Sequence, residues 1–252
     1  MDNCEVMSDI LRKVSFCITC KGRLHHLRQT LRDNIIANAD FDSVEFVLLN
    51  YSSPDDMSCW VLENLTDEIR SGRVAYYQLD GVSHYIPTHA KNVAHRLAAS
   101  PIVCNLDADN FTGSGFAAYL YEEFLKDKRI FVRTSGMRGA SGRLAFLKED
   151  FCSLGGYDED LNLGWGFDDT DLRNRAVAFG LRPVVLYHDS PFLGVIQHDD
   201  SERTKYTPES AKLVSRNAHA KMSKEQLSPV RNIGHNWGAA RLVKNFEEIV
   251  EI

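Results

Sequence analysis

The first hundred residues alternate regularly between short apolar runs and amphipathic segments. The apolar runs have the length of strands and lie at residues 14–20, 44–50, 74–79 and 102–106. Between them, apolar residues recur at helical spacing, as Leu24, Leu27, Leu31 and Ile35 do. This alternation is typical of a parallel sheet whose faces are covered by helices. We therefore predict an α/β fold built on a central, mostly parallel sheet.

Polar residues follow three of these runs at the point where each strand would end. They lie at 19–23 after the first run, at 50–56 after the second, and at Asp107 and Asp109 after the fourth. The carboxyl ends of neighbouring parallel strands meet at one edge of the sheet, and ligands of such folds bind at that edge. The sequence therefore predicts a binding site there.

The pattern is looser after residue 110. It predicts a helix at 114–126, strands at 130–133 and 144–147, a helix that ends before Gly180, and a strand at 183–187. The tail beyond residue 200 is first polar and then helical in pattern. Since no repeat or low-complexity linker divides the chain, we expect one compact body with a helical C-terminal tail.

The overall charge limits the kinds of ligand. The 252 residues include 29 Lys and Arg against 35 Asp and Glu, which gives a formal net charge of -6. A chain with this charge has no general attraction for nucleic acid, and we expect no nucleic-acid partner. An anionic substrate would need a metal ion or a local cluster of Lys and Arg.

Targeting signals and cysteines favour the cytoplasm. The N-terminal residues lack the uninterrupted apolar core of a signal peptide, and no apolar run is long enough to cross a bilayer. The 6 cysteines are scattered, which fits reduced thiols better than a disulfide framework. Cys17 and Cys20 form a C-x-x-C pair, but their odd spacing in a strand sends them to opposite faces, so we expect no zinc site.

Asp107 and Asp109 stand one residue apart at the end of a buried strand. Two carboxylates that turn toward one spot suit Mg²⁺ or Mn²⁺, above all when a diphosphate supplies the other oxygens. The cation would let an acidic pocket hold an anion. The run Asp-Ala-Asp-Asn also suits a plain solvated turn, because Asp and Asn favour turns.

Three stretches in order carry a family resemblance: CITCKGRLHHLRQTL, HAKNVAHRLAASPIVCNLDADN and GGYDEDLNLGWGFDDTDLRNRAVAFG. Over residues 14–200 the chain resembles the nucleotide-sugar-dependent glycosyltransferases of the GT-A fold. It is similar in particular to the bacterial family-two enzymes and to the animal β-1,4-galactosyltransferases. The resemblance implies a Rossmann-like GT-A sheet, with residues 1–110 as the nucleotide-sugar-binding half and residues 111–252 as the acceptor-binding half.

The resemblance also implies a donor site. It makes Asp109 the direct metal ligand, places Asp107 nearer the ribose, and matches His198 to the histidine that completes the metal shell, with His188 as the rival. The nucleotide would be bordered by Thr19, Lys21 and Arg23 at the end of the first strand, by Asn50 at the base, and by Lys91 at the ribose or phosphates.

The acceptor motif is Gly-Trp-Gly followed by Asp168 and Asp169. The family usually has Glu-Asp where this chain has Asp-Asp, which shortens one side chain by a methylene. Asp168 would bind the acceptor with Trp165 and Gly166, and Asp169 would be the catalytic base. Acidic residues at a helix start also serve as caps, and a tryptophan also serves as core, so both structural roles remain alternatives.

The implied reaction is metal-dependent transfer of a sugar, of the hexosyl class, from a UDP-linked donor to a carbohydrate or other glycosylated acceptor, with inversion and with Mn²⁺ or Mg²⁺ as cofactor. A non-catalytic carbohydrate- or nucleotide-sugar-binding protein on the same scaffold is an alternative. A D-x-D phosphohydrolase is another, although Phe111 stands where Thr or Val would be expected. A sugar nucleotidyltransferase would need a Gly-rich phosphate loop, which Cys20-Lys-Gly-Arg lacks.

Overall fold

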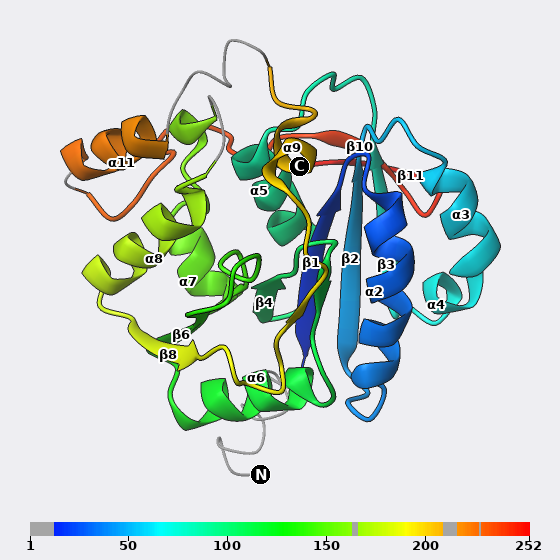
Figure 1. Cartoon of the computed structure of the whole chain (residues 1–252), viewed down its shortest axis with the longest axis horizontal. Helices are drawn as coiled ribbons and strands as arrows, with labels where there is room; N and C mark the ends of the chain where they lie inside the picture. The colour runs from blue at the N-terminus through cyan, green and yellow to red at the C-terminus, as the bar shows by residue number, and fades with distance from the viewer. Residues whose placement is uncertain (1–12, 163–165, 209–215, 227) are drawn as a thin grey trace.

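The computed structural model describes residues 13–162, 166–208, 216–226 and 228–252. In this part of the chain nine strands form one sheet in the order β11-β10-β3-β2-β1-β4-β7-β6-β8 (Figure 1). The strands are β1 (Val14–Cys20), β2 (Val44–Tyr51), β3 (Val74–Leu79), β4 (Ile102–Asn105), β6 (Ile130–Thr134), β7 (Leu144–Leu147), β8 (Arg182–Leu186), β10 (Arg241–Lys244) and β11 (Glu248–Glu251). Strands β3, β2, β1 and β4 are parallel neighbours, as predicted.

The helices lie on both faces of this sheet (Figure 1). They are α2 (Leu24–Ala37), α3 (Met57–Asn64), α4 (Thr66–Arg70), α5 (Pro87–Leu97), α6 (Phe116–Lys126), α7 (Lys148–Ser153), α8 (Asp168–Ala178), α9 (Asp200–Thr204) and α11 (Arg216–Glu225). One core layer joins the sheet to α2, α3 and α6, and the other joins it to α5, α7 and α8. Successive side chains of a strand point to opposite faces, and β1 feeds both layers.

The two cysteines of β1 illustrate this alternation. Cys17 belongs to the layer under α5, and Cys20 belongs to the layer under α2. Their separation onto opposite faces is confirmed, so the C-x-x-C pair does not form a ligand pair. The cysteines of the described residues are all free thiols.

A second, two-stranded sheet fixes the edge where the ligand site was predicted. It pairs β5 (Asn110–Phe111) with β9 (Gly194–Val195) in antiparallel fashion. The backbone N–H of Ile196 also donates to the carbonyl of Asp109 at 2.8 Å. This pairing brings residues close to position 198 against the end of β4.

The structure differs from the sequence prediction in three places. The sequence pattern between the second and third strands predicts one helix at about 57–71, but the structure has two helices there, α3 and α4, with a break at Leu65. On either side of the break, the Asn64 amide donates to the Trp60 carbonyl and the Thr66 hydroxyl to the Leu62 carbonyl. Side-chain bonds of this kind compete with a continuing helix. The short helix α7 was not predicted.

The C-terminal tail is only partly helical. It contains α9 and α11, but it ends in the hairpin β10–β11, which adds to β3 at the edge of the sheet. The turn of the hairpin uses left-handed backbone at Asn245 and Phe246. Among the described helices, none combines the length and the apolar content needed to cross a bilayer.

Candidate active site

The turn after β4 holds the two carboxylates of the D-x-D sequence in one pocket. The Asn105 amide donates to Asp107 Oδ1 at 3.1 Å and to the Gly142 carbonyl at 2.9 Å. A Cβ atom on residue 142 would lie 2.7 Å from Asp107 Oδ2, so a glycine is needed there. Burial raises the pKa of Asp107, with Lys91 opposing the shift and Asp109 adding to it.

Asp109 is buried and is the centre of a cluster of charged groups. Its Oδ2 lies 2.6 Å from His198 Nε2 and 3.5 Å from Arg23 Nη1, and its Oδ1 accepts from the Asn110 amide at 2.7 Å. His198 therefore meets Asp109 across 89 residues of chain. His188, the rival, is exposed and lies beside Gly136.

Arg143 supports the D-x-D turn from the interior of the protein. Its side chain is fully buried, and it donates to the carbonyls of Phe192 and Phe111 and to Asn110 Oδ1. These three acceptors belong to the D-x-D turn and to the segment that leads to β9. The guanidinium thus ties together the two chain segments that carry Asp109 and His198.

We expect Arg143→Ala to lower the free energy of unfolding by about 3 kcal/mol or more, because it leaves several buried acceptors without donors. Urea unfolding followed by circular dichroism measures the change. The matched control is Arg182→Ala, which removes an arginine from a surface ion pair with Asp127 and should cost about 1 kcal/mol or less. Equal losses for the two variants would contradict the assigned role of Arg143.

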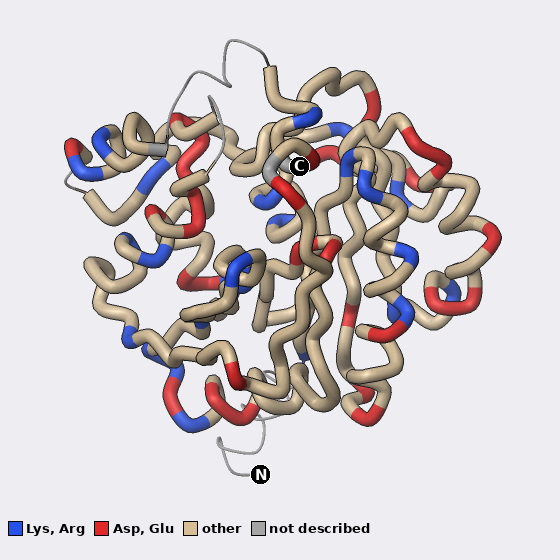
Figure 2. The backbone as a smooth tube through the Cα atoms, in the orientation of Figure 1, with Lys and Arg blue, Asp and Glu red and all other residues tan. Residues whose placement is uncertain are grey.

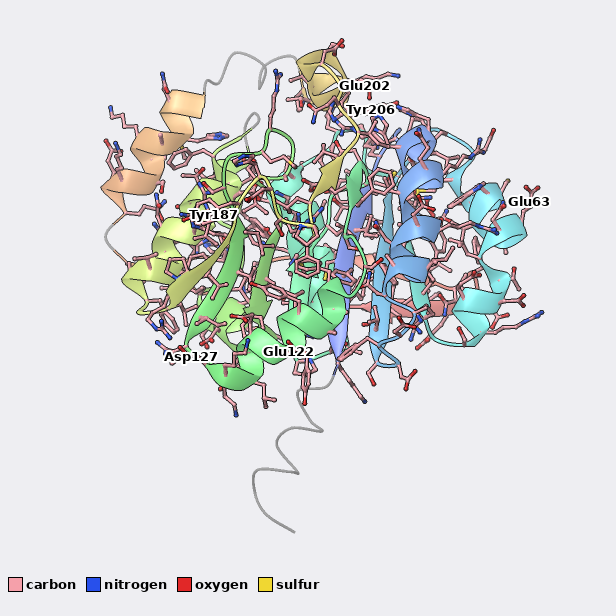
Figure 3. All side chains as sticks on the ribbon, turned by 60° about the horizontal axis from the view of Figure 1, so that its bottom comes forward. Glu63, Glu122, Asp127, Tyr187, Glu202 and Tyr206 are labelled. Carbon is pink, nitrogen blue, oxygen red and sulfur yellow. The ribbon has the colours of Figure 1, made fainter. Side chains whose placement is uncertain are left out.

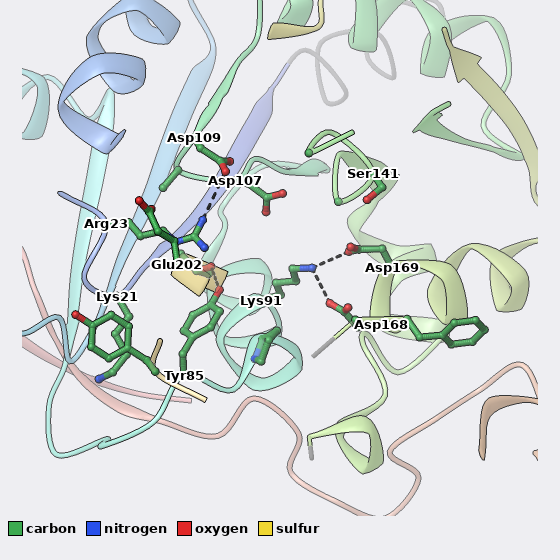
Figure 4. Close-up of a pocket in the computed structure, with 18 of the residues that line it drawn as sticks. Lys21, Arg23, Tyr85, Lys91, Asp107, Asp109, Ser141, Asp168, Asp169 and Glu202 are labelled. Carbon is green, nitrogen blue, oxygen red and sulfur yellow. Dashed lines mark hydrogen bonds and ion pairs between the residues drawn. The ribbon is translucent and has the colours of Figure 1, made fainter. Parts of the chain in front are cut away.

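A second pair of carboxylates lies on another side of the same pocket (Figure 4). Lys91 Nζ, from α5, donates at 2.7 Å to Asp168 Oδ2 and at 2.7 Å to Asp169 Oδ1, both from α8. The ammonium also lies 4.9 Å from the centre of the Tyr157 ring. One buried cation therefore serves two carboxylates.

These three groups titrate together. Burial would raise the pKa of Asp168, but the Lys91 charge and hydrogen bond hold it below its usual value. Burial and the Asp168 charge raise the pKa of Asp169 to about 7, against the opposing effect of Lys91. The side chain of Asp169 is also the more exposed of the pair, at 19% against 9%. Asp169 is thus the carboxylate suited to exchange a proton near neutral pH.

The backbone at the start of α8 explains how the pair is presented. Phe167 is the N-cap residue, with a left-handed φ of 77° and no capping hydrogen bond from its side chain. The Asp168 carboxylate accepts backbone hydrogen bonds at the start of the helix, and these help to lower its pKa. His219 of α11 makes a 2.8 Å hydrogen bond with the Gly166 carbonyl. A non-glycine residue in this conformation costs about 1–3 kcal/mol and is typical of functional sites. Trp165 lies outside the described residues.

The structure brings most of the predicted site residues to one pocket. Its lining includes Thr19, Lys21, Arg23, Lys91, Asp107, Asp109, Gly166, Asp168 and Asp169. Asn50 does not line it: its amide bonds Ser58 and Tyr76, and its Oδ1 accepts from the backbone N–H of Ser53. The Lys21 ammonium donates to the carbonyls of Tyr51, Ser52 and Val82, so it braces the pocket wall.

Sequence reasoning missed the residues that reach the pocket from loops and from the tail. Tyr85 bonds the Thr19 hydroxyl at 2.6 Å, and its backbone N–H donates to the Tyr206 carbonyl at 2.9 Å. Glu202 and Tyr206 lie together at one end of the molecule (Figure 3). A Cβ atom at position 22 would lie 2.2 Å from the Tyr206 ring, so only a glycine leaves room for that ring. The glycine in the Lys-Gly-Arg turn was therefore the one sign in the sequence that another segment packs closely there.

The charges of the molecule are mixed, with Lys and Arg interspersed among Asp and Glu along the chain (Figure 2). The cations of the pocket are local: Arg23, Lys21 and Lys91 stand among four aspartates. The carboxylates outnumber these cations, so an anionic ligand would need a metal ion in the pocket as well.

The comparisons with known proteins come from sequence and from structure. The family model described as the N-terminal domain of galactosyltransferase matches residues 121–199, which include Asp168, Asp169 and His198. A search of the curated proteins finds no match.

Solved structures share the architecture at low sequence identity. The structure of GalNAc-T7 with UDP, GalNAc and Mn²⁺ aligns with a TM-score of 0.58 and 16% identity over 72% of this chain and 43% of that one. The structure of S. aureus TarS 1–349 with UDP aligns with a TM-score of 0.57 and 14% identity, over 77% of this chain and 63% of that one. The Pyrobaculum calidifontis mannosyltransferase PcManGT with GDP-Man and Mn²⁺ aligns with a TM-score of 0.56 and 20% identity, over 70% of this chain and 55% of that one.

These alignments confirm the resemblance at the level of the fold. The chain spans between 43% and 63% of the lengths of those three structures. The chain has the GT-A fold of nucleotide-sugar glycosyltransferases.

Proposed function

We propose that this chain is a metal-dependent glycosyltransferase that moves a hexosyl group from a UDP-linked donor to an acceptor hydroxyl with inversion. One observation carries the proposal: a single pocket joins two carboxylate pairs with different surroundings (Figure 4). Asp107 and Asp109 stand near Arg23, whereas Asp168 and Asp169 share Lys91. The GT-A fold and the partial galactosyltransferase match support this reading.

The first pair forms the donor side. Asp109 and His198 would hold the divalent cation, with Asp107 beside them, and this set of oxygen and imidazole donors suits Mn²⁺ as well as Mg²⁺. When bound, the cation supplies the positive charge that neutralises the leaving diphosphate. Aligned structures that contain UDP or GDP-Man together with Mn²⁺ support the pairing of a nucleoside diphosphate donor with a divalent cation.

On the donor side, Arg23 would serve first as a partner of Asp109 and then as a ligand of the diphosphate. Its guanidinium lies 3.5 Å from Asp109 Oδ2 and shares that oxygen with His198. A cation on Asp109 would take over the charge compensation, and Arg23 would then be free to donate to phosphate oxygens. Thr19 and Asp107 would border the nucleotide, with Lys21 and Asn50 supporting the wall from behind.

The second pair forms the acceptor side. The acceptor oxygen would bond to the anomeric carbon while the bond from that carbon to the diphosphate oxygen breaks, and the electron pair would leave with UDP. The acceptor proton would pass to Asp169, whose raised pKa suits a base at neutral pH. Asp168, kept charged by Lys91, would accept a hydrogen bond from the acceptor. Inversion follows from attack opposite the leaving group.

The two predicted halves of the chain would both contribute to each side. Residues 1–110 supply most of the donor side, yet His198 comes from the C-terminal half. Lys91 comes from the N-terminal half, yet it holds the acceptor carboxylates. The active site would therefore need both halves folded together.

Release of UDP tests the proposal. We expect the purified chain to release UDP from at least one UDP-sugar in the presence of Mn²⁺, and to release far less in EDTA. A coupled assay for UDP over a panel of UDP-sugars, with and without simple sugars as acceptors, measures this. UDP-sugar binding without any release would indicate the non-catalytic alternative, and release of inorganic phosphate from simple phosphate esters would indicate a phosphohydrolase.

A further inference from the structure

A third imidazole stands beside the proposed metal ligands. His26 comes from the first turn of α2, and its ring is stacked on that of His198 with the two centres 5.2 Å apart. One ligand atom from each of His26, Asp109 and His198 lies within 4.8 Å of the other two. Neither the fold nor the D-x-D sequence required a histidine at this place.

The environment of His26 is unusual for a buried polar side chain. The residue is 4% exposed, and its Nδ1 atom is buried without a hydrogen-bond partner. Its Nε2 has a carboxylate oxygen of Glu202 at 3.7 Å, which is beyond hydrogen-bond distance. An unsatisfied buried nitrogen costs about 1–3 kcal/mol, and a bound ion or water beside it would remove this cost.

The start of α2 holds His26 rigidly. The backbone N–H of Leu24 donates to Asp55 Oδ2 at 3.0 Å, and that of Gly22 donates to Ser53 Oγ at 2.6 Å. The His26 N–H donates to the Arg23 carbonyl at 3.0 Å. A ligand on such a fixed turn meets a cation with little ordering cost.

We propose that His26 is a third protein ligand of the divalent cation, beside Asp109 and His198. The inference rests on the proposed function, because it concerns the same cation. Two imidazoles and one carboxylate form a softer set than carboxylates alone, and they leave coordination positions open for the diphosphate. Mg²⁺ prefers oxygen ligands, so the site should favour Mn²⁺ and Co²⁺ over Mg²⁺.

The neighbouring histidine supplies a matched control. His25 precedes His26 on the same helix, but its side chain is 57% exposed and lies 3.4 Å from Glu202. His25, His26 and Glu202 form a second group that could hold a cation, and that group excludes Asp109. Variants of the two histidines therefore distinguish the two sites.

The test is titration of the full chain with Co²⁺ in the absence of nucleotide, followed by visible absorption and by calorimetry. We expect His26→Ala and His198→Ala each to weaken Co²⁺ binding by at least tenfold, and to weaken Mg²⁺ binding less. His25→Ala should bind Co²⁺ as the parent does. His26→Gln, which keeps most of the buried volume, should show the same loss if the Ala variant fails to fold.

Two results would overturn the inference. If His26→Ala and His26→Gln bind Co²⁺ as the parent does while Asp109→Ala does not bind it, His26 is no ligand and the proposed function stands. If His25→Ala and Glu202→Ala lose Co²⁺ as strongly as His26→Ala while Asp109→Ala retains it, the cation belongs to the other group. A parent chain that binds no divalent cation even with UDP present would remove both the inference and the metal from the proposed function.

Discussion

Asp169→Asn should lower kcat by on the order of a hundredfold or more, while the affinities for UDP and for Mn²⁺ stay near those of the parent. The asparagine has the same size as the aspartate and can still accept a hydrogen bond from Lys91 at the Oδ1 position. It cannot take a proton from the acceptor. Initial rates of UDP release with acceptor, together with calorimetric titration of UDP, separate the chemical step from donor binding.

The pH profile gives an independent check on the same residue. Because burial and the charge of Asp168 raise the pKa of Asp169 to about 7, only part of the enzyme carries the ionised base at neutral pH. The parent kcat/KM should therefore rise as the pH increases through about 7, and this limb should be absent in Asp169→Asn. The apparent pKa belongs to the unit formed with Asp168 and Lys91.

Asp160→Asn is the matched control for this prediction. Asp160 belongs to the same acidic stretch of sequence, but it does not line the pocket. Its turnover and its pH profile should equal those of the parent. A role for Asp169 in helix stability alone predicts intact turnover with a small loss of stability. A product that retains the donor's anomeric configuration would also remove the need for a base opposite the leaving group.

The site was predictable from the sequence where a motif and a strand end coincide. Asp107 and Asp109 follow the apolar run of β4, and Asp168 and Asp169 open α8, so family resemblance and strand periodicity agree on them. The structure places all four in one pocket. The parallel core of the sheet was predicted for the same reason, since strands buried on both faces produce clear apolar runs.

Side-chain direction was the harder part. Asn50 is the residue before the end of β2 and lies on the same face as Leu48, which belongs to the layer under α2 and α3. Its amide therefore meets Ser58 and Tyr76 rather than the pocket. The period of two along the strand already contained this information. Position at a strand end is thus a weaker guide than the parity of the residue within the strand.

For the residues that arrive from distant loops, the sequence carries only an indirect signal, the glycine at position 22. Glu202 and Tyr206 belong to a short polar helix and the turn after it. Tyr206 lies over Gly22 and Glu202 lies beside His25 and His26, on the segment that follows the pairing of β5 with β9. That pairing involves two residues on each strand, too few for a periodic pattern. The hairpin β10–β11 was not predicted for a related reason, because its charged and largely exposed strands lack an apolar run.

Asp109→Ala should abolish the part of UDP binding that depends on metal, with a fall of at least a hundredfold in affinity in the presence of Mn²⁺. Loss of a residue that merely orients a metal ligand costs 10- to 100-fold, and a direct ligand costs at least as much. The variant loses the side-chain contacts of Asp109 with His198, Arg23 and Asn110. The fold should survive, because the turn keeps its backbone hydrogen bonds, among them that from the Ile196 N–H to the carbonyl of residue 109. Calorimetric titration of UDP with Mn²⁺ and in EDTA measures the metal-dependent and the metal-independent affinity. Asp109→Asn repeats the test with the side-chain volume kept.

The sign of the effect in EDTA makes this prediction sharp. Without a cation, Asp109 repels a diphosphate and also occupies Arg23, which lies 3.5 Å from its Oδ2. Removing the carboxylate takes away one negative charge and frees one guanidinium, so UDP should bind the variant in EDTA as well as the parent, or more tightly. Asp127→Ala is the control, because Asp127 lies at the end of the molecule away from Glu202 and Tyr206 (Figure 3). It should change the UDP affinity neither with Mn²⁺ nor in EDTA. If the parent binds UDP equally well with Mn²⁺ and in EDTA, then the cation has no place in donor binding and Asp109 serves only to hold His198 and Arg23.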